Sequence, residues 1–147
     1  MTLRILITGS RAWTDKKTIE RAIIDAIDTH GTHLITHDDH GPTLRWDQIT
    51  IVHGAARGAD HIAGRIATVW GMRVEEHPAD WDAHGRSAGP IRNTEMVRLG
   101  ADVCLAFPTG RSVGTRHCMS LAQGAGIPVR SYEQVAAQPS YSRGGAA

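Results

Sequence analysis

The sequence predicts an α/β protein, a Rossmann-like three-layer sandwich whose sheet is mostly parallel and has five or more strands. Short apolar runs rich in β-branched residues alternate along the chain with longer segments whose apolar residues recur at helical spacing. This alternation favours parallel strands with helices on both faces of the sheet. The chain has 147 residues, of which 41% are hydrophobic, and this length suits one domain with a substantial core.

Five segments are predicted as strands because they are short, apolar and rich in β-branched side chains. They cover residues 4–8, 49–53, 72–77, 102–107 and 127–130. Four segments are predicted as helices because their apolar residues recur every three or four positions. They cover residues 15–30, 60–70, 90–99 and 115–123. The apolar positions of the first helix are Ile19, Ala22, Ile23, Ala26 and Ile27.

Residues at the helix ends support these boundaries. Asp60 is a suitable N-cap for the second helix, and Pro90 is tolerated in the first turn of the third. Gly31, Gly71 and Gly100 follow the first three helices and are suited to ending them.

Two segments lie outside the alternation of strands and helices. Residues 31–48 contain many turn-forming residues and are predicted as an insert that forms a loop or a small hairpin. Residues 133–147 consist mainly of small and polar residues and are predicted as a flexible C-terminal tail. We therefore assign residues 1–132 to a single Rossmann-like domain.

Composition and charge argue against several classes of protein. The formal net charge is +1, which gives no basic excess for binding duplex nucleic acid. No apolar run is long enough to span a membrane, and the N-terminus leads into a strand rather than a signal peptide. Cys104 and Cys118 form no CxxC motif or disulfide framework. We expect a cytoplasmic protein in a reducing compartment, without a membrane partner.

Three glycine-containing loops that follow predicted strands indicate a phosphate-binding site. They cover residues 9–11, 54–60 and 108–115, and each carries an arginine. Glycine permits close backbone approach, and the helix after each loop offers unpaired N–H groups and a partial positive charge. The carboxyl ends of parallel strands meet at one edge of the sheet, where ligands bind in such folds. We expect the three loops to form one anion-binding edge.

Some of these residues could instead have a purely structural role. Gly9 could serve only the turn between strand and helix, and Asp60 could act only as a helix cap. If Asp60 faces the site, its carboxylate could accept a hydrogen bond from a ribose hydroxyl. The chain has neither the GxGxxG dinucleotide fingerprint nor the GxxxxGK[ST] motif of nucleoside triphosphate sites.

A fourth stretch after the third predicted strand adds polar and aromatic candidates. Trp81 could stack on a base or simply shield the edge of the sheet. Arg92 and Asn93 fall in the first turn of a predicted helix, where a cation opposes the helix dipole. An anionic ligand would explain an arginine at this position.

Together these segments resemble the SLOG superfamily, the Rossmann-like group that includes DprA/Smf and the LOG enzymes, and in particular its small single-domain YspA-like branch. The similarity extends over residues 4–131 and is carried by Gly-Ser-Arg, His-Gly-Ala-Ala-Arg-Gly-Ala-Asp, Pro-Ala-Asp-Trp, Gly-Pro-Ile-Arg-Asn and Asp-Val-Cys-Leu-Ala-Phe-Pro. The resemblance implies a site for a nucleotide or nucleotide-derived ligand, such as a ribonucleotide, ADP-ribose or an NAD-like molecule.

The residues that the resemblance places at this site are Gly9, Ser10, Arg11, Gly54, Arg57, Gly58, Asp60, Arg92, Asn93, Gly110, Gly114 and Thr115. The loop chemistry adds Trp81 and Ser112 as ligand-binding candidates. We expect the Arg92→Ala variant to weaken nucleotide binding with little loss of fold stability.

The LOG enzymes cleave the N-glycosidic bond of cytokinin nucleoside monophosphates, which makes a phosphoribohydrolase an alternative function. Arg92 matches the arginine of their motif. Their PGGxGTxxE motif is altered here, because residues are inserted between Pro108 and Gly114 and no glutamate follows where the catalytic one is expected. Cleavage of this bond needs acid/base or electrostatic help, so the catalytic residue stays unassigned. The remaining candidate catalytic side chains are those of Glu95, His117, Asp80 and Asp82.

Three further alternatives have less support. His30, His33, His37 and His40, with Asp38 and Asp39, fit no structural zinc pattern, so we predict surface histidines and no metal. Cys118 at a helix start could be a nucleophile, although packing is the simpler role. Single-stranded DNA binding, as in DprA, would need a basic stripe and stacking aromatics that the sequence lacks. We expect no required cofactor besides the nucleotide ligand, and a homodimer or higher homo-oligomer, because relatives of this fold often complete the site across a dimer.

Overall fold

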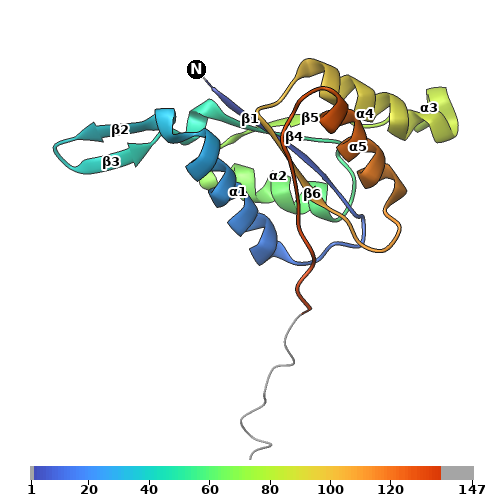
Figure 1. Ribbon diagram of the computed structural model, residues 1–147, viewed down its shortest axis with the longest axis horizontal. Coiled ribbons are helices and arrows are strands. Elements are labelled where there is room, and N and C mark those ends of the chain that lie inside the picture. Colours follow the sequence, from blue (N-terminus) through green and yellow to red (C-terminus); the bar gives the residue numbers. More distant parts are fainter. Residues whose placement is uncertain (1, 137–147) are drawn as a thin grey trace, which may run out of the picture.

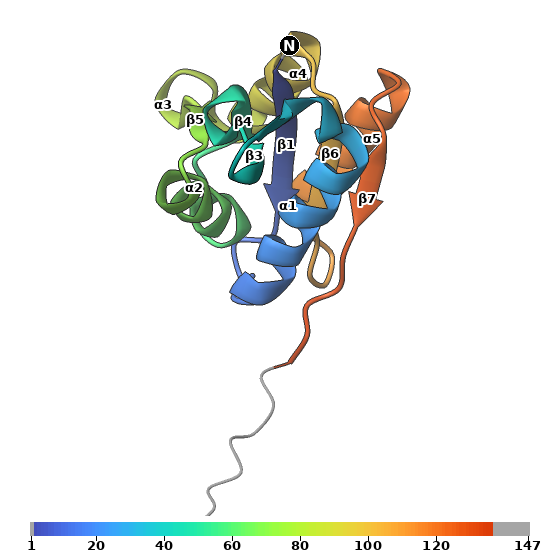
Figure 2. The same cartoon turned by 90° about the vertical axis from the view of Figure 1, so that its left-hand side faces the viewer.

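A computed structural model describes residues 2–136 of the chain. The central sheet contains β1 (Leu3–Gly9), β4 (Ile49–His53), β5 (Arg73–Glu76), β6 (Val103–Phe107) and β7 (Val129–Ser131). Its strands are all parallel, in the order β5-β4-β1-β6-β7 (Figures 1 and 2). The predicted α/β class and parallel sheet are therefore confirmed. The strand order changes direction at β1, which makes the carboxyl end of β1 a topological switch point.

Helices cover both faces of this sheet (Figures 1 and 2). On one face, α1 (Lys16–His30) and α2 (Ala59–Trp70) pack on the larger buried apolar cluster; on the other, α4 (Ala88–Leu99) and α5 (Val113–Gly124) pack on the smaller. Alternate residues of β1 face the two layers, as the pleat of a strand requires: Ile5 and Ile7 join the first cluster and Leu6 the second. No helix within residues 2–136 is both long and apolar enough to cross a membrane.

The short helix α3 (Trp81–His84) and the 3-10 turn Gly85–Ser87 precede α4 and were not predicted. Asp80 caps α3 by accepting a hydrogen bond from the Ala83 N–H at 3.1 Å. Helix α4 begins at Ala88, two residues before Pro90, where the sequence predicted its start. A helix of one turn carries too little periodic pattern to be recognised in a sequence.

Helix α1 follows the predicted pattern closely. All five of its periodic apolar residues, Ile19, Ala22, Ile23, Ala26 and Ile27, are buried. Asp15 caps its start, because the carboxylate accepts the Thr18 N–H at 3.2 Å. Gly31 ends the helix with φ of −117°, so it does not adopt the left-handed conformation that is common for a glycine after a helix. The end of α2 differs, because Gly71 has φ of 88°.

The segment predicted as an insert contains an antiparallel hairpin of β2 (Ile35–Asp38) and β3 (Gly41–Leu44), flanked by the 3-10 turns Thr32–Leu34 and Trp46–Gln48. The hairpin projects from the side of the domain (Figure 1). At the other end of the chain, the Val135 N–H donates to Asp15 at 2.9 Å. Most of the predicted C-terminal tail, residues 137–147, lies outside the described residues.

Glycines allow the loops after β1 and β4 to touch one another directly. The Ala59 N–H donates to the Ser10 carbonyl at 3.1 Å. A Cβ at Gly58 would overlap the Ser10 carbonyl and the Arg11 backbone, and a Cβ at Gly9 would overlap the Ala59 side chain. These glycines therefore permit close approach between two protein segments, whereas the sequence suggested close approach of a ligand.

We predict that Gly58→Ala lowers the free energy of unfolding by about 2 kcal/mol or more, because it combines a steric overlap with φ of 72° and ψ of −125°, which alanine disfavours. Gly126→Ala is the matched control, since φ is 79° there but no atom lies within 4 Å of the new Cβ; we expect it to cost only about 1 kcal/mol. Urea denaturation of both variants measures the difference. Equal losses would contradict the steric explanation.

Candidate functional site

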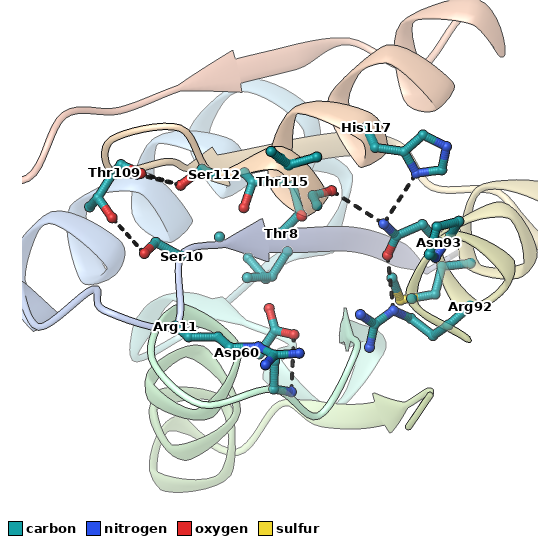
Figure 3. Close-up of a pocket in the computed structure, with 18 of the residues that line it drawn as sticks. Thr8, Ser10, Arg11, Asp60, Arg92, Asn93, Thr109, Ser112, Thr115 and His117 are labelled. Carbon is teal, nitrogen blue, oxygen red and sulfur yellow. Dashed lines mark hydrogen bonds between the residues drawn. The ribbon is translucent and has the colours of Figure 1, made fainter. Parts of the chain in front are cut away.

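A cavity of about 610 Å³ opens at the carboxyl ends of β1 and β6, between the loops that follow β1, β4 and β6 and the start of α4 (Figure 3). It lies at the switch point of the sheet, where ligands bind in open α/β folds. Many of its lining residues are ones that the sequence singled out. These are Gly9, Ser10, Arg11, Asp60, Trp81, Arg92, Asn93, Ser112, Gly114, Thr115 and His117.

The N-terminus of α5 faces this cavity without a side-chain cap. Ser112 precedes the helix with φ of 40°, and its hydroxyl interacts with Thr109, whose N–H donates to it at 2.8 Å. The first helical bond runs from the Arg116 N–H to the Ser112 carbonyl at 2.9 Å. The N–H groups of residues 113–115 therefore have no partner among the described residues and lie at the positive end of the helix dipole. This is a suitable arrangement for binding an anion.

Asp60 does not cap α2, and that prediction is wrong. Gly58 occupies the N-cap position, while Asp60 lies inside the first turn and turns its carboxylate back to the preceding loop. Its Oδ2 accepts the Gly54 N–H at 3.0 Å and the Ala56 N–H at 3.3 Å. Its Oδ1 has no hydrogen-bond partner among residues 2–136, although the side chain lines the cavity and is 5% exposed.

Burial raises the pKa of Asp60 to about 6, because an ionised carboxylate loses its hydration there. The two backbone N–H donors and the charges of Arg92 and Arg11 oppose this rise without cancelling it. Asp60 is thus a buried carboxyl group that titrates close to neutral pH, with one oxygen that has no hydrogen-bond partner among residues 2–136.

Arg92 reaches across the carboxyl edge of the sheet from α4. Its Nη1 donates to the Gly54 carbonyl and, at 3.4 Å, to the His77 carbonyl, while Nε donates to Asn93 Oδ1 at 2.9 Å. A Cβ at Gly54 would overlap the guanidinium, so this glycine makes room for Arg92. Burial lowers the pKa of Arg92. Replacing Arg92 by alanine would break these contacts, so the expectation of little stability loss does not fit the structure.

The Asn93 amide is occupied by protein partners. Its oxygen accepts from Arg92, and its Nδ2 donates to the Gly114 carbonyl at 3.2 Å and lies 3.4 Å from His117 Nδ1. Asn93 is buried and connects α4 to the start of α5. Its geometry therefore favours a positioning role over direct contact with a ligand.

Arg11 and Trp81 form the outer part of the cavity. The guanidinium carbon of Arg11 lies 5.5 Å from the centroid of the Trp81 ring, within the range of a cation–π interaction. Trp81 is 49% exposed, and no hydrogen bond from Arg11 to another described side chain is present. An exposed ring with a cation beside it provides a surface on which a planar group can stack.

Several predicted residues do not line the cavity. Arg57 is exposed and is not among the residues that line the cavity. Gly54, Gly58 and Gly110 are also absent from the lining, and Glu95 lies on the exposed side of α4. Cys118 is fully buried in the α4–α5 layer, so it is not placed to act as a nucleophile at the cavity.

The sequence reasoning missed three polar lining residues, Thr8, Thr109 and Arg86. Thr8 is the penultimate residue of β1, and a polar residue directly after the apolar run Ile5–Ile7 was an available signal. Arg86 lies in the unpredicted turn before α4. Among the described residues, no group of three or more His, Cys, Asp or Glu side chains could hold a metal ion.

We predict that Asp60→Asn stabilises the ligand-free protein at pH 8 by up to about 3 kcal/mol, the cost that corresponds to the rise in pKa from 3.8 to about 6. The asparagine oxygen can still accept both loop N–H groups. Above pH 6 the folded wild type carries the costly charge. As the pH falls from 6 to about 4, Asp60 becomes protonated in the folded state first, so the advantage of the variant disappears.

Urea denaturation of both proteins at pH 8 and pH 4 measures this difference. The pKa of Glu75 is lowered to about 2, chiefly by its hydrogen bond with Arg4, so both proteins lose stability in strong acid when this carboxylate is protonated. This loss is the same in both proteins and does not affect the difference between them. A variant that is less stable than the wild type at pH 8 would show that the Asp60 charge stabilises the fold.

Comparisons with known proteins identify the family of the chain. The sequence model of the "YspA, cpYpsA-related SLOG family" matches residues 3–84, more than half of the chain. A curated relative, the Gene 61 protein of Mycobacterium phage D29, is 52% identical over 136 residues, which cover 88% of this chain and 95% of the relative. No solved structure matches the chain significantly. The chain belongs to the YspA, cpYpsA-related SLOG family, as its loop motifs indicated.

Proposed function

We propose that this protein binds a nucleotide or nucleotide-derived ligand in the cavity at the carboxyl edge of the sheet. The observation that carries the proposal is the uncapped N-terminus of α5, which faces the same cavity as Arg11, Arg86 and Arg92. Free backbone N–H groups, a helix dipole and guanidinium groups all favour a phosphate. Membership of a SLOG family supports a nucleotide-related role.

The remaining parts of the cavity fit the rest of a nucleotide. Trp81 and Arg11 offer a stacking surface at the mouth, where a base can lie against a half-exposed ring. The volume of about 610 Å³ has room for a ligand larger than a free phosphate ion. A ribonucleotide, ADP-ribose and an NAD-like molecule all combine a phosphate with a stacking base.

We predict that Arg11→Ala weakens binding of AMP, ADP-ribose or NAD by about tenfold or more, because it removes a charge-assisted contact worth roughly 1.5–3 kcal/mol. Arg57→Ala is the matched control, since it removes the same charge from an exposed loop residue outside the cavity. Isothermal titration calorimetry with both variants and the wild type gives the affinities. If the two variants lose affinity equally, the ligand is not held in this cavity.

Cleavage of the N-glycosidic bond is a second candidate function, and Asp60 is the observation that favours it. It is the only carboxylate that lines the cavity among the described residues, and its pKa near 6 suits a group that exchanges protons at neutral pH. Against this, the Glu95 carboxylate is exposed on α4 and His117 is turned toward Asn93. We therefore give binding the priority over hydrolysis.

We predict that AMP, NAD and ADP-ribose are recovered intact after prolonged incubation with the purified protein. Liquid chromatography of the mixture separates the nucleotide from its free base. Asp60→Asn is the control for any activity found, since a hydrolase that uses this carboxylate would lose it. Release of adenine or nicotinamide by the wild type alone would replace the binding proposal with a glycoside hydrolase.

A further inference from the structure

The free oxygen of Asp60 is the most unusual polar atom in the cavity. Oδ2 is satisfied by two backbone N–H groups, but Oδ1 accepts no hydrogen bond within residues 2–136. The side chain is 5% exposed and its carboxylate lies across the carboxyl end of β1 from Ser112 and Thr115 (Figure 3). A buried acceptor without a donor lowers stability, so it indicates a group that a bound molecule completes.

The missing partner must donate a hydrogen bond, and a fully ionised ligand phosphate has no donor to supply. A phosphate instead fits the opposite side of the cavity, at the free N–H groups of α5. A sugar hydroxyl is the part of a nucleotide that donates hydrogen bonds and lies next to the phosphate. Asn93 is a weaker candidate for this role, because both ends of its amide already bond to protein atoms.

The part of the cavity near Trp81 has a different character. Besides the ring itself, it offers the guanidinium of Arg11 over that ring and the backbone of Gly89 close to its edge. Among the described residues, the only amide and carboxylate side chains that line the cavity are those of Asn93 and Asp60, which the loops and the sugar would engage. Stacking alone discriminates little, because every base has an aromatic face.

We propose, on the basis of the nucleotide site argued above, that the protein selects its ligand by the sugar and not by the base. A ribose hydroxyl donates to Asp60 Oδ1 while the phosphate binds the N-terminus of α5, and the base is stacked on Trp81 with little distinction between purines and pyrimidines. The recognised unit is a phosphorylated ribose, whether it occurs free or within a larger nucleotide.

Calorimetric titrations of the full-length wild type test this specificity. We expect AMP, GMP, CMP and UMP to bind with affinities within about tenfold of one another, and ribose 5-phosphate to compete with AMP. At least one of 2′-deoxy-AMP and 3′-deoxy-AMP should bind more weakly than AMP by about tenfold or more, because the analogue that lacks the donating hydroxyl leaves Asp60 Oδ1 without a partner. Equal affinity for AMP and both deoxy analogues would overturn the role of Asp60, and a preference above 100-fold for one base would overturn selection by the sugar.

The Asp60→Asn variant provides the residue-level test. Its amide nitrogen replaces Oδ1 by a donor, so we expect AMP affinity to fall toward that of the weaker deoxy analogue, whose own affinity changes little. Asp28→Asn is the control, because it makes the same substitution at an exposed residue of α1 outside the cavity lining. Unchanged discrimination in Asp60→Asn, with folding verified by circular dichroism, would contradict the proposal.

These outcomes separate the two levels of the proposal. If no ribonucleotide and no ribose 5-phosphate binds the wild type, the proposed nucleotide site itself is wrong. If they bind without any effect of the sugar hydroxyls, the nucleotide site stands and only the sugar selection fails.

Discussion

The hydrogen bonds made by Asp60 and Arg92 hold the candidate site together. Asp60 fixes loop 54–60 from the α2 side by accepting two of its N–H groups, and Arg92 fixes it from the α4 side by donating to the Gly54 carbonyl. These two residues belong to helices on opposite faces of the sheet. Their shared loop therefore links both helical layers at the carboxyl edge, and Asn93 extends the link to α5 through the Gly114 carbonyl.

Unfavourable local features collect around this link. Ala55 and Ser112 are the non-glycine residues with positive φ among the described residues, at 57° and 40°, and they lie in the loops after β4 and β6. His53, which is 2% exposed, supports the first of them by accepting the Ala55 N–H at 2.9 Å. A strained backbone, a buried carboxylate and an uncapped helix each lower stability. Their concentration in one place is typical of a binding site.

The cavity combines two kinds of surface that the sheet topology brings together. Because β4 and β6 flank β1 on either side, their following loops approach the cavity from opposite directions. The segment after β4 contributes the Asp60 carboxylate, and the segment after β6 contributes the free backbone N–H groups at the start of α5. Helix α3 and the loop after β1 supply the Trp81 ring and the Arg11 guanidinium at the mouth of the cavity. Such a division suits a ligand that is itself divided into anion, hydroxylated sugar and planar ring.

The sequence by itself determined the strands of the central sheet, the four long helices that cover it and the edge at which the cavity opens. Apolar periodicity is a local property, so the burial of α1 and the alternation of β1 could be predicted from neighbouring residues alone. The location of the cavity followed as well, because the carboxyl ends of the strands in a parallel sheet meet at one edge.

Only the tertiary structure decided which loop residues face the cavity and what each one does. Arg11 and Arg57 looked equivalent in the sequence, yet only Arg11 lines the cavity. Gly9 and Gly58 proved to separate two protein loops, and Asp60 proved to hold a loop instead of capping a helix. The physical reason is that the direction of a loop side chain depends on backbone contacts between distant segments, such as that of Ala59 with Ser10, and such contacts leave no periodic signal in the sequence.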